Sequence, residues 1–200
     1  MEKNITRDFY NNHAEELINQ YDHAKVVQLH SLFSKYIRID NVVLDIGFGS
    51  GRDLREISKI TPNIFGIDAC EKFIKNAEQN ITLQGRVTKS ILPDIIIDGF
   101  KINVDSFDVI VSIAVLMHLD MKEIEQTIEK MKSILTMNGI VIISYSLKRK
   151  HIDDRHFEPL TREIIRDIFR KFGFIKIDES QNNDGMNRKI EWVIQVYRVD

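Results

Sequence analysis

A glycine-rich turn after an apolar run is the feature that most constrains how this chain folds. Residues 42–46 read Val-Val-Leu-Asp-Ile, and Gly47, Gly49 and Gly51 follow before a helix-like segment that begins near Arg52. Glycine allows positive φ and lets a ligand approach the backbone closely. The free amides and the positive dipole end of a helix favour an anionic or polar group. The stretch therefore predicts a strand, a tight turn and a helix N-terminus that bind a nucleotide-like ligand.

Two classes of nucleotide-binding protein use such a turn. The dinucleotide fingerprint G-x-G-x-x-G needs a third glycine and an acidic residue about 20 positions later. Reading from Gly47 places Arg52 at the third glycine, and reading from Gly49 places Leu54 there. An acidic residue, Asp45, lies inside the expected strand instead. The chain therefore lacks one glycine of the dinucleotide fingerprint.

The run Asp45-Ile-Gly-Phe-Gly-Ser-Gly51 resembles motif I of the class I S-adenosylmethionine-dependent methyltransferases. A second stretch is similar to the same family. Residues 107–113, Phe-Asp-Val-Ile-Val-Ser-Ile, resemble its Phe-Asp-x-Ile strand, and Leu-Met-His at 116–118 resembles its Leu-x-His segment. The resemblance covers roughly residues 40–200 and implies S-adenosyl-L-methionine as the cofactor.

The resemblance also implies which residues contact that cofactor. Asp68 ends an apolar run 21 residues after Gly47. A carboxylate there can accept both hydroxyls of a ribose, and capping the following helix is the alternative. Ser90 stands where the family usually has an acidic residue, which leaves adenine recognition to its hydroxyl and the backbone near Ile91, or to Asp94 in a shifted register. The expected cofactor-binding residues are Asp45, Gly47, Phe48, Gly49, Arg52, Asp68, Ala69, Ser90, Ile91 and Ile113.

His118 is the titratable residue best placed beside the expected methyl group. A neutral imidazole can take a proton from an attacking hydroxyl or amine, so we expect His118 to be catalytic. Packing at the methionine end of the cofactor is the alternative reading of this histidine. No residue in the sequence requires a metal ion.

Residues 4–38 lack proline and glycine and carry apolar residues at helical spacing. They predict two helices with a break near residues 19–22. Many small-molecule methyltransferases that resemble this chain use such a leader as a lid over the ligand. We therefore expect Tyr10 and Tyr21 to face the acceptor, with amphipathic packing as the alternative.

A basic segment follows the strand expected at residues 140–144. Residues 148–176 hold nine Lys or Arg against five Asp or Glu. Arg155 lies past the carboxyl end of that strand, where ligands bind in open α/β sheets, and its guanidinium can hold a carboxylate or phosphate. The segment favours a small-molecule acceptor that carries negative charge, and a solvated surface is the alternative.

Composition limits the class of protein. The 200 residues are 43% hydrophobic, which suits one domain with a core and a pocket. A net charge of −2 disfavours nucleic acid as a partner. Cys70 is the only cysteine, which excludes an internal disulfide framework. Neither a signal peptide nor a membrane span is evident, so we expect a cytoplasmic enzyme.

Strand-like and helix-like segments alternate after residue 40 and predict a single doubly wound α/β domain. The final strand, expected at residues 190–198, follows its predecessor through a loop and should run antiparallel to it. The resemblance implies a seven-stranded sheet of order 3-2-1-4-5-7-6 with helices on both faces. Residues 1–40 then form an N-terminal helical lid on the domain of residues 41–200.

The leading hypothesis is an S-adenosylmethionine-dependent methyltransferase that acts on an oxygen or nitrogen of a small molecule. One alternative is a nicotinamide-dependent oxidoreductase, against which the missing third glycine counts. Another is a cofactor-binding module without activity. The sequence leaves open the identity of the acceptor, the choice between oxygen and nitrogen, and the oligomeric state.

Overall fold

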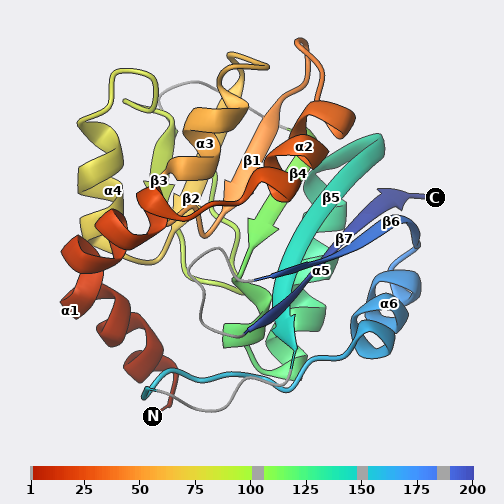
Figure 1. Ribbon diagram of the computed structural model, residues 1–200. Coiled ribbons are helices and arrows are strands. Elements are labelled where there is room, and N and C mark those ends of the chain that lie inside the picture. Colours follow the sequence, from red (N-terminus) through yellow and green to blue (C-terminus); the bar gives the residue numbers. More distant parts are fainter. Residues whose placement is uncertain (1, 101–105, 148–152, 184–189) are drawn as a thin grey trace.

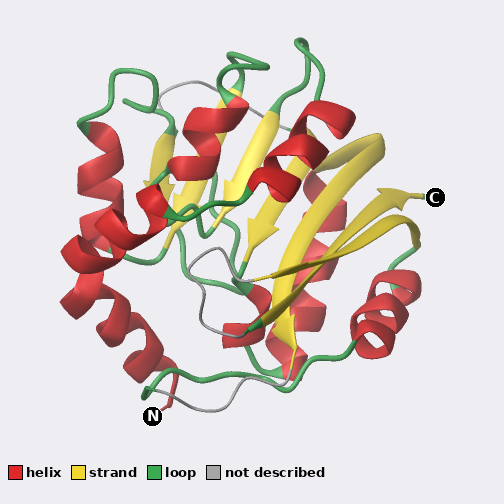
Figure 2. Cartoon of the chain, viewed as in Figure 1, coloured by secondary structure: helices red, strands yellow, loops and turns green. Residues whose placement is uncertain are grey.

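The computed structural model describes residues 2–100, 106–147, 153–183 and 190–200, and they form a seven-stranded sheet flanked by helices (Figures 1 and 2). The strands are β1 Val43–Ile46, β2 Ile64–Asp68, β3 Val87–Lys89, β4 Phe107–Ile113, β5 Leu135–Leu147, β6 Phe174–Asn183 and β7 Glu191–Val199. The helices are α1 Glu2–His23, α2 Val27–Tyr36, α3 Arg52–Ile57, α4 Glu71–Glu78, the 3-10 turn η1 Leu116–His118, α5 Met121–Ile134 and α6 Arg162–Lys171.

The strand order is β3-β2-β1-β4-β5-β7-β6, as predicted. The first five strands run parallel to their neighbours, and their nearly continuous apolar character suits a sheet covered on both faces. β7 is antiparallel to both β5 and β6, with Ile142 opposite Val196 in the β5–β7 pair. The last strand therefore runs antiparallel to its predecessor, as the sequence indicated.

Each face of the sheet buries its own apolar cluster. Helices α1 to α4 cover one face, where Leu54 and Phe73 pack against alternate residues of the strands. Helices α5 and α6 cover the other face, where Ile128 and Phe169 are fully buried. Because successive strand residues point to opposite faces, the parallel strands contribute to both clusters.

Two predicted boundaries differ from the structure. α1 continues to His23, past the break expected at residues 19–22, because those residues include no glycine or proline to stop a helix. The chain instead turns at residues 24–26. The three isoleucines at residues 95–97 also favour a short helix within residues 94–105. Residues 94–97 have no regular structure and residues 98–100 form a turn, whereas residues 101–105 lie outside the described residues.

The strands place one end of the sheet beneath α1. β1, β2 and β4 point toward the side of the molecule on which α1 lies, and α1 packs beside α4 (Figure 1). The carboxyl ends of parallel strands are where open α/β sheets bind ligands. In the described ranges, no helix combines the length and apolar character needed to cross a membrane.

The packing on the α5 face generates a stability prediction. Ile128→Ala should lower the free energy of unfolding by about 2–5 kcal/mol, because it removes a fully buried side chain and leaves a cavity. Ile81→Ala, at a side chain that is 87% exposed, is the matched control and should change little. Denaturant unfolding of both variants measures the difference, and equal losses would contradict the assigned core.

Candidate functional site

A cavity of about 1030 Å³ opens at the carboxyl ends of β1, β2 and β4. All residues for which a binding or catalytic role was predicted line it: Tyr10, Tyr21, Asp45, Gly47, Phe48, Gly49, Arg52, Asp68, Ala69, Ser90, Ile91, Ile113, His118 and Arg155. The fold thus brings together side chains that lie up to 145 positions apart in the sequence. Their individual roles stay predictions.

The glycine turn forms the floor of the cavity. Gly47, Gly49 and Gly51 have φ values of 74°, 57° and 80°. A Cβ on Gly47 would lie 2.4 Å from a methyl carbon of Val115. Positive φ and this close approach together require glycine at position 47. The turn therefore leaves backbone, rather than side chains, facing a ligand.

Asp68 lies at the end of β2 and is buried. Its carboxylate accepts the backbone N–H of Gly49 at 2.9 Å and that of Cys70 at 2.8 Å. The second bond is local, while the first joins Asp68 to the glycine turn. Burial raises the pKa of Asp68 to about 6, and the backbone donors oppose that rise. A ligand that donates hydrogen bonds would stabilise the ionised carboxylate.

Asp45 adds a second buried carboxyl group on the same floor. It is 2% exposed, and burial raises its pKa well above the ordinary range, with further contributions from the negative charges of Asp53 and Asp68. Three carboxyl groups so close together favour a cationic group on the ligand. The floor of the cavity therefore suits a nucleoside that also carries a positive charge.

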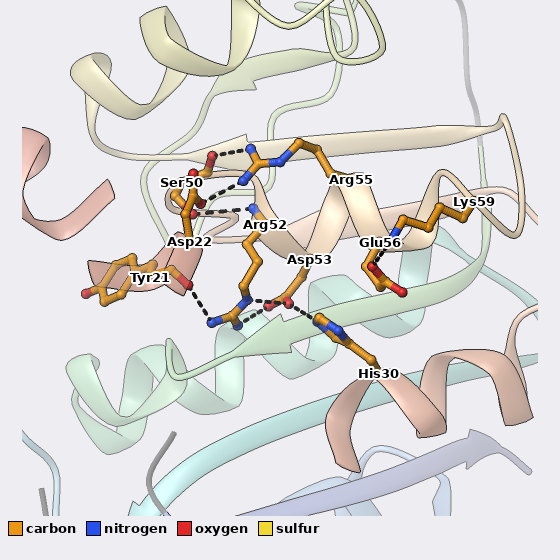
Figure 3. Close-up of polar contacts among 9 residues, drawn as sticks. All are labelled: Tyr21, Asp22, His30, Ser50, Arg52, Asp53, Arg55, Glu56 and Lys59. Atoms are coloured by element: carbon orange, nitrogen blue, oxygen red, sulfur yellow. Dashed lines mark hydrogen bonds and ion pairs between the residues drawn. The ribbon is translucent and has the colours of Figure 1, made fainter. Parts of the chain in front are cut away.

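A polar cluster beside the turn ties the N-terminal helices to α3 (Figure 3). Arg52 donates two hydrogen bonds to the Asp53 carboxylate, at 2.9 and 2.8 Å, and one to the carbonyl oxygen of Tyr21 at 3.2 Å. His30 of α2 donates to Asp53 at 2.9 Å. Both partners lower the pKa of Asp53 against the effect of its burial. Arg52, which is a predicted cofactor contact, therefore also holds the end of α1.

Arg55 forms a second link between α3 and α1 (Figure 3). It donates to the Asp22 carboxylate at 2.6 Å and to the carbonyl oxygen of Ser50 at 2.9 Å. The ring of Tyr21 then lies over the turn, 3.6 Å from where a Cβ on Gly49 would be. The C-terminal end of α1 is therefore fixed above the glycine turn.

His118 lines another part of the cavity, beside Tyr10 of α1. Its Nδ1 is 2.8 Å from the carbonyl oxygen of His156, which can only accept, so Nδ1 carries a proton. Its Nε2 is 2.9 Å from the Tyr10 hydroxyl. In the neutral ring Nε2 is therefore the acceptor, and Tyr10 donates to it. The ring of Phe157 packs at 4.7 Å from the imidazole.

Arg155, which follows β5 in the chain, extends this network to α1. It is 7% exposed, so the solvated surface considered for this segment does not describe Arg155. Its guanidinium donates to Asp153 at 2.8 and 2.7 Å and to the Tyr10 hydroxyl at 3.0 Å. The charge of Arg155 is thus already paired, and an anionic acceptor would compete with Asp153.

Ser90 has internal partners in the loop after β3. Its hydroxyl donates to the carbonyl oxygen of Asp94 at 2.7 Å and accepts the N–H of Ile96 at 2.9 Å. Asp94, the alternative for adenine recognition, pairs with Lys130 and does not line the cavity. Ser90 therefore shapes the loop whose residues Ile91 and Leu92 face the cavity.

Sequence reasoning missed part of the lining. Phe73, Val115, Ser144 and Trp192 border the cavity, as do the α1–α2 connection and the start of α2 at residues 24–29. Periodicity marks such residues as core packing, so no local signal separates them from ordinary buried side chains. No group of three or more His, Cys, Asp or Glu positioned for a metal ion occurs in the portion of the chain described.

Comparison with known proteins identifies the domain. Residues 43–139 match the family model described as a methyltransferase domain. The chain is 27% identical over 152 residues to phosphoethanolamine N-methyltransferase 1 of Zea mays, a match that covers 76% of this chain. It covers only 30% of that relative's length.

Solved structures share the fold at low sequence identity. A 1,6-didemethyltoxoflavin-N1-methyltransferase of Burkholderia thailandensis, with S-adenosylhomocysteine bound, has a TM-score of 0.73 and 17% identity, covering 96% of this chain and 86% of that one. The [4+2]-cyclase SpnF also has a TM-score of 0.73, with 14% identity and coverage of 100% and 96%. The domain match bears out the resemblance to the class I S-adenosylmethionine-dependent methyltransferases, and the solved structures share its fold.

Burial of Asp68 predicts how stability depends on pH. Its pKa is higher in the folded protein, about 6, than its ordinary value of 3.8. The protonated form therefore favours folding, and this contribution is lost as pH rises through 6. Between pH 5 and pH 7.5 the unliganded protein should lose about 1–2 kcal/mol of unfolding free energy relative to Asp68→Asn.

Denaturant unfolding at both pH values measures this difference. Asp94→Asn, at an exposed carboxyl, is the control and should follow the unmodified protein. Identical pH dependence in the unmodified protein and Asp68→Asn would contradict the raised pKa.

Proposed function

We propose that this chain, whose residues 43–139 match a methyltransferase domain, transfers the methyl group of S-adenosylmethionine to a nitrogen or oxygen of a small molecule. The observation that carries the proposal is a single cavity that joins the glycine turn and Asp68 at one end to His118 at the other. The first end suits a nucleoside, and the second offers a group that can accept a proton.

The residues present fit the cofactor. Asp68 would accept the ribose hydroxyls, and the turn at Gly47 and Gly49 leaves room for the backbone to meet the ligand. Asp45 would attract the ammonium group of the methionine part, since burial and the negative charges of Asp53 and Asp68 disfavour an uncompensated charge on its carboxyl. Ser90 and Ile91 border the expected adenine position. The cofactor supplies an electrophilic methyl group, and the cavity supplies proximity and orientation.

We assign removal of the acceptor's proton to the hydrogen-bonded pair Tyr10 and His118. Tyr10 donates to His118 Nε2, so an acceptor group bound beside Tyr10 reaches the imidazole through the phenol oxygen. As the acceptor loses its proton to Tyr10, the proton of Tyr10 moves to Nε2. His118 thereby acts as the base, and the carbonyl oxygen of His156 holds its Nδ1–H.

A nitrogen acceptor has the stronger support. The curated relative is named for N-methylation of phosphoethanolamine, and the Burkholderia enzyme is named as an N1-methyltransferase. The acceptor must fit beneath α1, between Tyr10, Tyr21 and Trp192, which favours a small molecule. The preference for an anionic acceptor now rests on the basic segment alone, because Arg155 is paired with Asp153.

One structural neighbour keeps a second function open. The cyclase that shares this fold shows that the architecture alone does not fix methyl transfer. A cofactor-binding module without activity is compatible with the same floor of the cavity. Binding of the cofactor without turnover across a broad panel of amines and alcohols would favour that second function.

Cofactor binding is tested by calorimetry with S-adenosylhomocysteine. Asp68→Asn should weaken binding about tenfold or more, because it removes a charged acceptor from the ribose hydroxyls. Asp94→Asn, outside the cavity, should bind as the unmodified protein does. Absence of binding to the unmodified protein at millimolar ligand would remove the proposed function.

The role of His118 is tested by turnover at saturating cofactor with any acceptor found in the panel. His118→Ala should reduce the rate by at least about tenfold, because the proton loses its acceptor. Cofactor affinity should stay close to that of the unmodified protein. A smaller loss in rate would leave His118 as a packing residue.

A further inference from the structure

Arg155 is enclosed by aromatic rings at the reaction end of the cavity. Its guanidinium carbon lies 4.5 Å from the ring centre of Phe9, 5.3 Å from that of Tyr10 and 5.2 Å from that of Phe157. Two of these rings belong to α1, and the third follows Arg155 in the chain. Cations and aromatic faces attract each other most when desolvated, so this site holds the guanidinium firmly.

The hydrogen bonds of Arg155 fix its orientation. Nε and Nη2 donate to the two oxygens of Asp153, and Nη1 donates to the Tyr10 oxygen. A bidentate pair of this kind sets the plane of the guanidinium and therefore the direction of Nη1. Asp153 thus determines where Arg155 meets Tyr10.

The same bonds fix the direction of the Tyr10 hydroxyl proton. Arginine cannot accept a hydrogen bond, so the Tyr10 oxygen must accept from Nη1. The Tyr10 proton is then free to point at His118 Nε2, which lies 2.9 Å away. Without Arg155 the phenol could rotate and donate elsewhere.

We propose that Arg155, held by Asp153, is a positioning residue that directs the Tyr10 hydroxyl onto His118 and keeps the N-terminal half of α1 over the reaction end of the cavity. The effect of this positioning on catalysis rests on the proposed function. The effect of Arg155 on the orientation of Tyr10 and on the position of α1 does not depend on that function.

The effect of Arg155 on the pKa of Tyr10 supports this positioning role. Burial raises the pKa of Tyr10, and the charge of Arg155 and its hydrogen bond oppose that rise. The guanidinium therefore stabilises negative charge on the phenol oxygen while its proton shifts toward His118. Lysine cannot replace it fully, because a compact ammonium lacks the planar fork that contacts Asp153 and Tyr10 together.

A second contact from the same segment holds α1. The backbone N–H of His156 donates to the Thr6 hydroxyl at 2.9 Å. Thr6 and Tyr10 are four residues apart and therefore lie on one face of α1. Residues 153–157 therefore contact that face of α1 at both Thr6 and Tyr10. Arg52 and Arg55 contact the other end of the helix.

The experiment compares Arg155→Met and Arg155→Lys with the control Arg162→Met, all without ligand and with S-adenosylhomocysteine. Arg162 pairs with Glu179 on the far side of the sheet and does not line the cavity. Nitrogen-15 NMR of histidine, assigned to His118 with His118→Gln, reports its tautomer and its hydrogen bond to Tyr10. Hydrogen exchange reports opening of residues 6–13.

In Arg155→Met the His118 Nε2 signal should move to the position found in Tyr10→Phe, and exchange of residues 6–13 should rise about tenfold. Arg155→Lys should give intermediate values, because it keeps the charge without the fork. Affinity for S-adenosylhomocysteine should change less than about threefold in both variants, since Arg155 contacts Asp153 and Tyr10 rather than Asp68 or the glycine turn. Arg162→Met should leave all three readouts unchanged.

Two outcomes would overturn the proposal. One is an unchanged Nε2 signal with unchanged exchange in Arg155→Met. The other is the same increase in exchange across the sheet as in α1, which would mark a general loss of stability. If Arg155→Met does not fold, Arg155→Lys and Asp153→Asn decide the question by the same readouts. Because the measurements on the unliganded protein need no cofactor, failure of the proposed function would appear separately, as absence of ligand binding.

Discussion

The close approach of Gly47 to Val115 is the contact on which the cavity depends. It joins the turn after β1 to the turn after β4, and no side chain larger than hydrogen fits at position 47. Because these turns follow adjacent parallel strands, their contact brings the glycine turn and the segment that carries His118 together. Gly49 then meets Asp68 from β2, so three neighbouring strands form one continuous floor.

Much of this arrangement follows from sequence because it depends on backbone constraints. Alternating glycines, an acidic residue at the end of an apolar run and apolar runs of strand length are local signals, and they predicted the strands and the turn. The strand order and the cofactor contacts came from the resemblance that those signals carry. The end of α1 was misjudged because residues 19–22 contain no glycine or proline, so no residue there ends the helix. Arg52 and Arg55, some 30 positions away, contact its last turn, and such distant contacts are not visible in local periodicity.

The hydrogen-bond partners and tautomers of individual side chains could not be predicted from the sequence. Arg155 was expected to offer its charge to a ligand, whereas the folded chain places Asp153 and Tyr10 around it. The tautomer of His118 depends on a carbonyl oxygen 38 positions away. Such properties arise from packing between segments, and they decide the chemistry of the site more than residue type does. A methyltransferase and a cyclase also share this fold, so the architecture alone does not determine the reaction either.

The cavity has two walls of different origin. The turn at Gly47 and Asp68 belong to the sheet and its first helices, whereas Tyr10, Tyr21 and Arg155 come from α1 and the segment after β5. Substitutions at Arg155 can change the second wall without touching the glycine turn, whereas Tyr21 lies over that turn. Under the proposed function, donor use and acceptor choice are therefore only partly coupled in this architecture. The N-terminal half of α1 and the segment after β5 can diversify together without altering the floor, since residues 153–157 contact α1 directly.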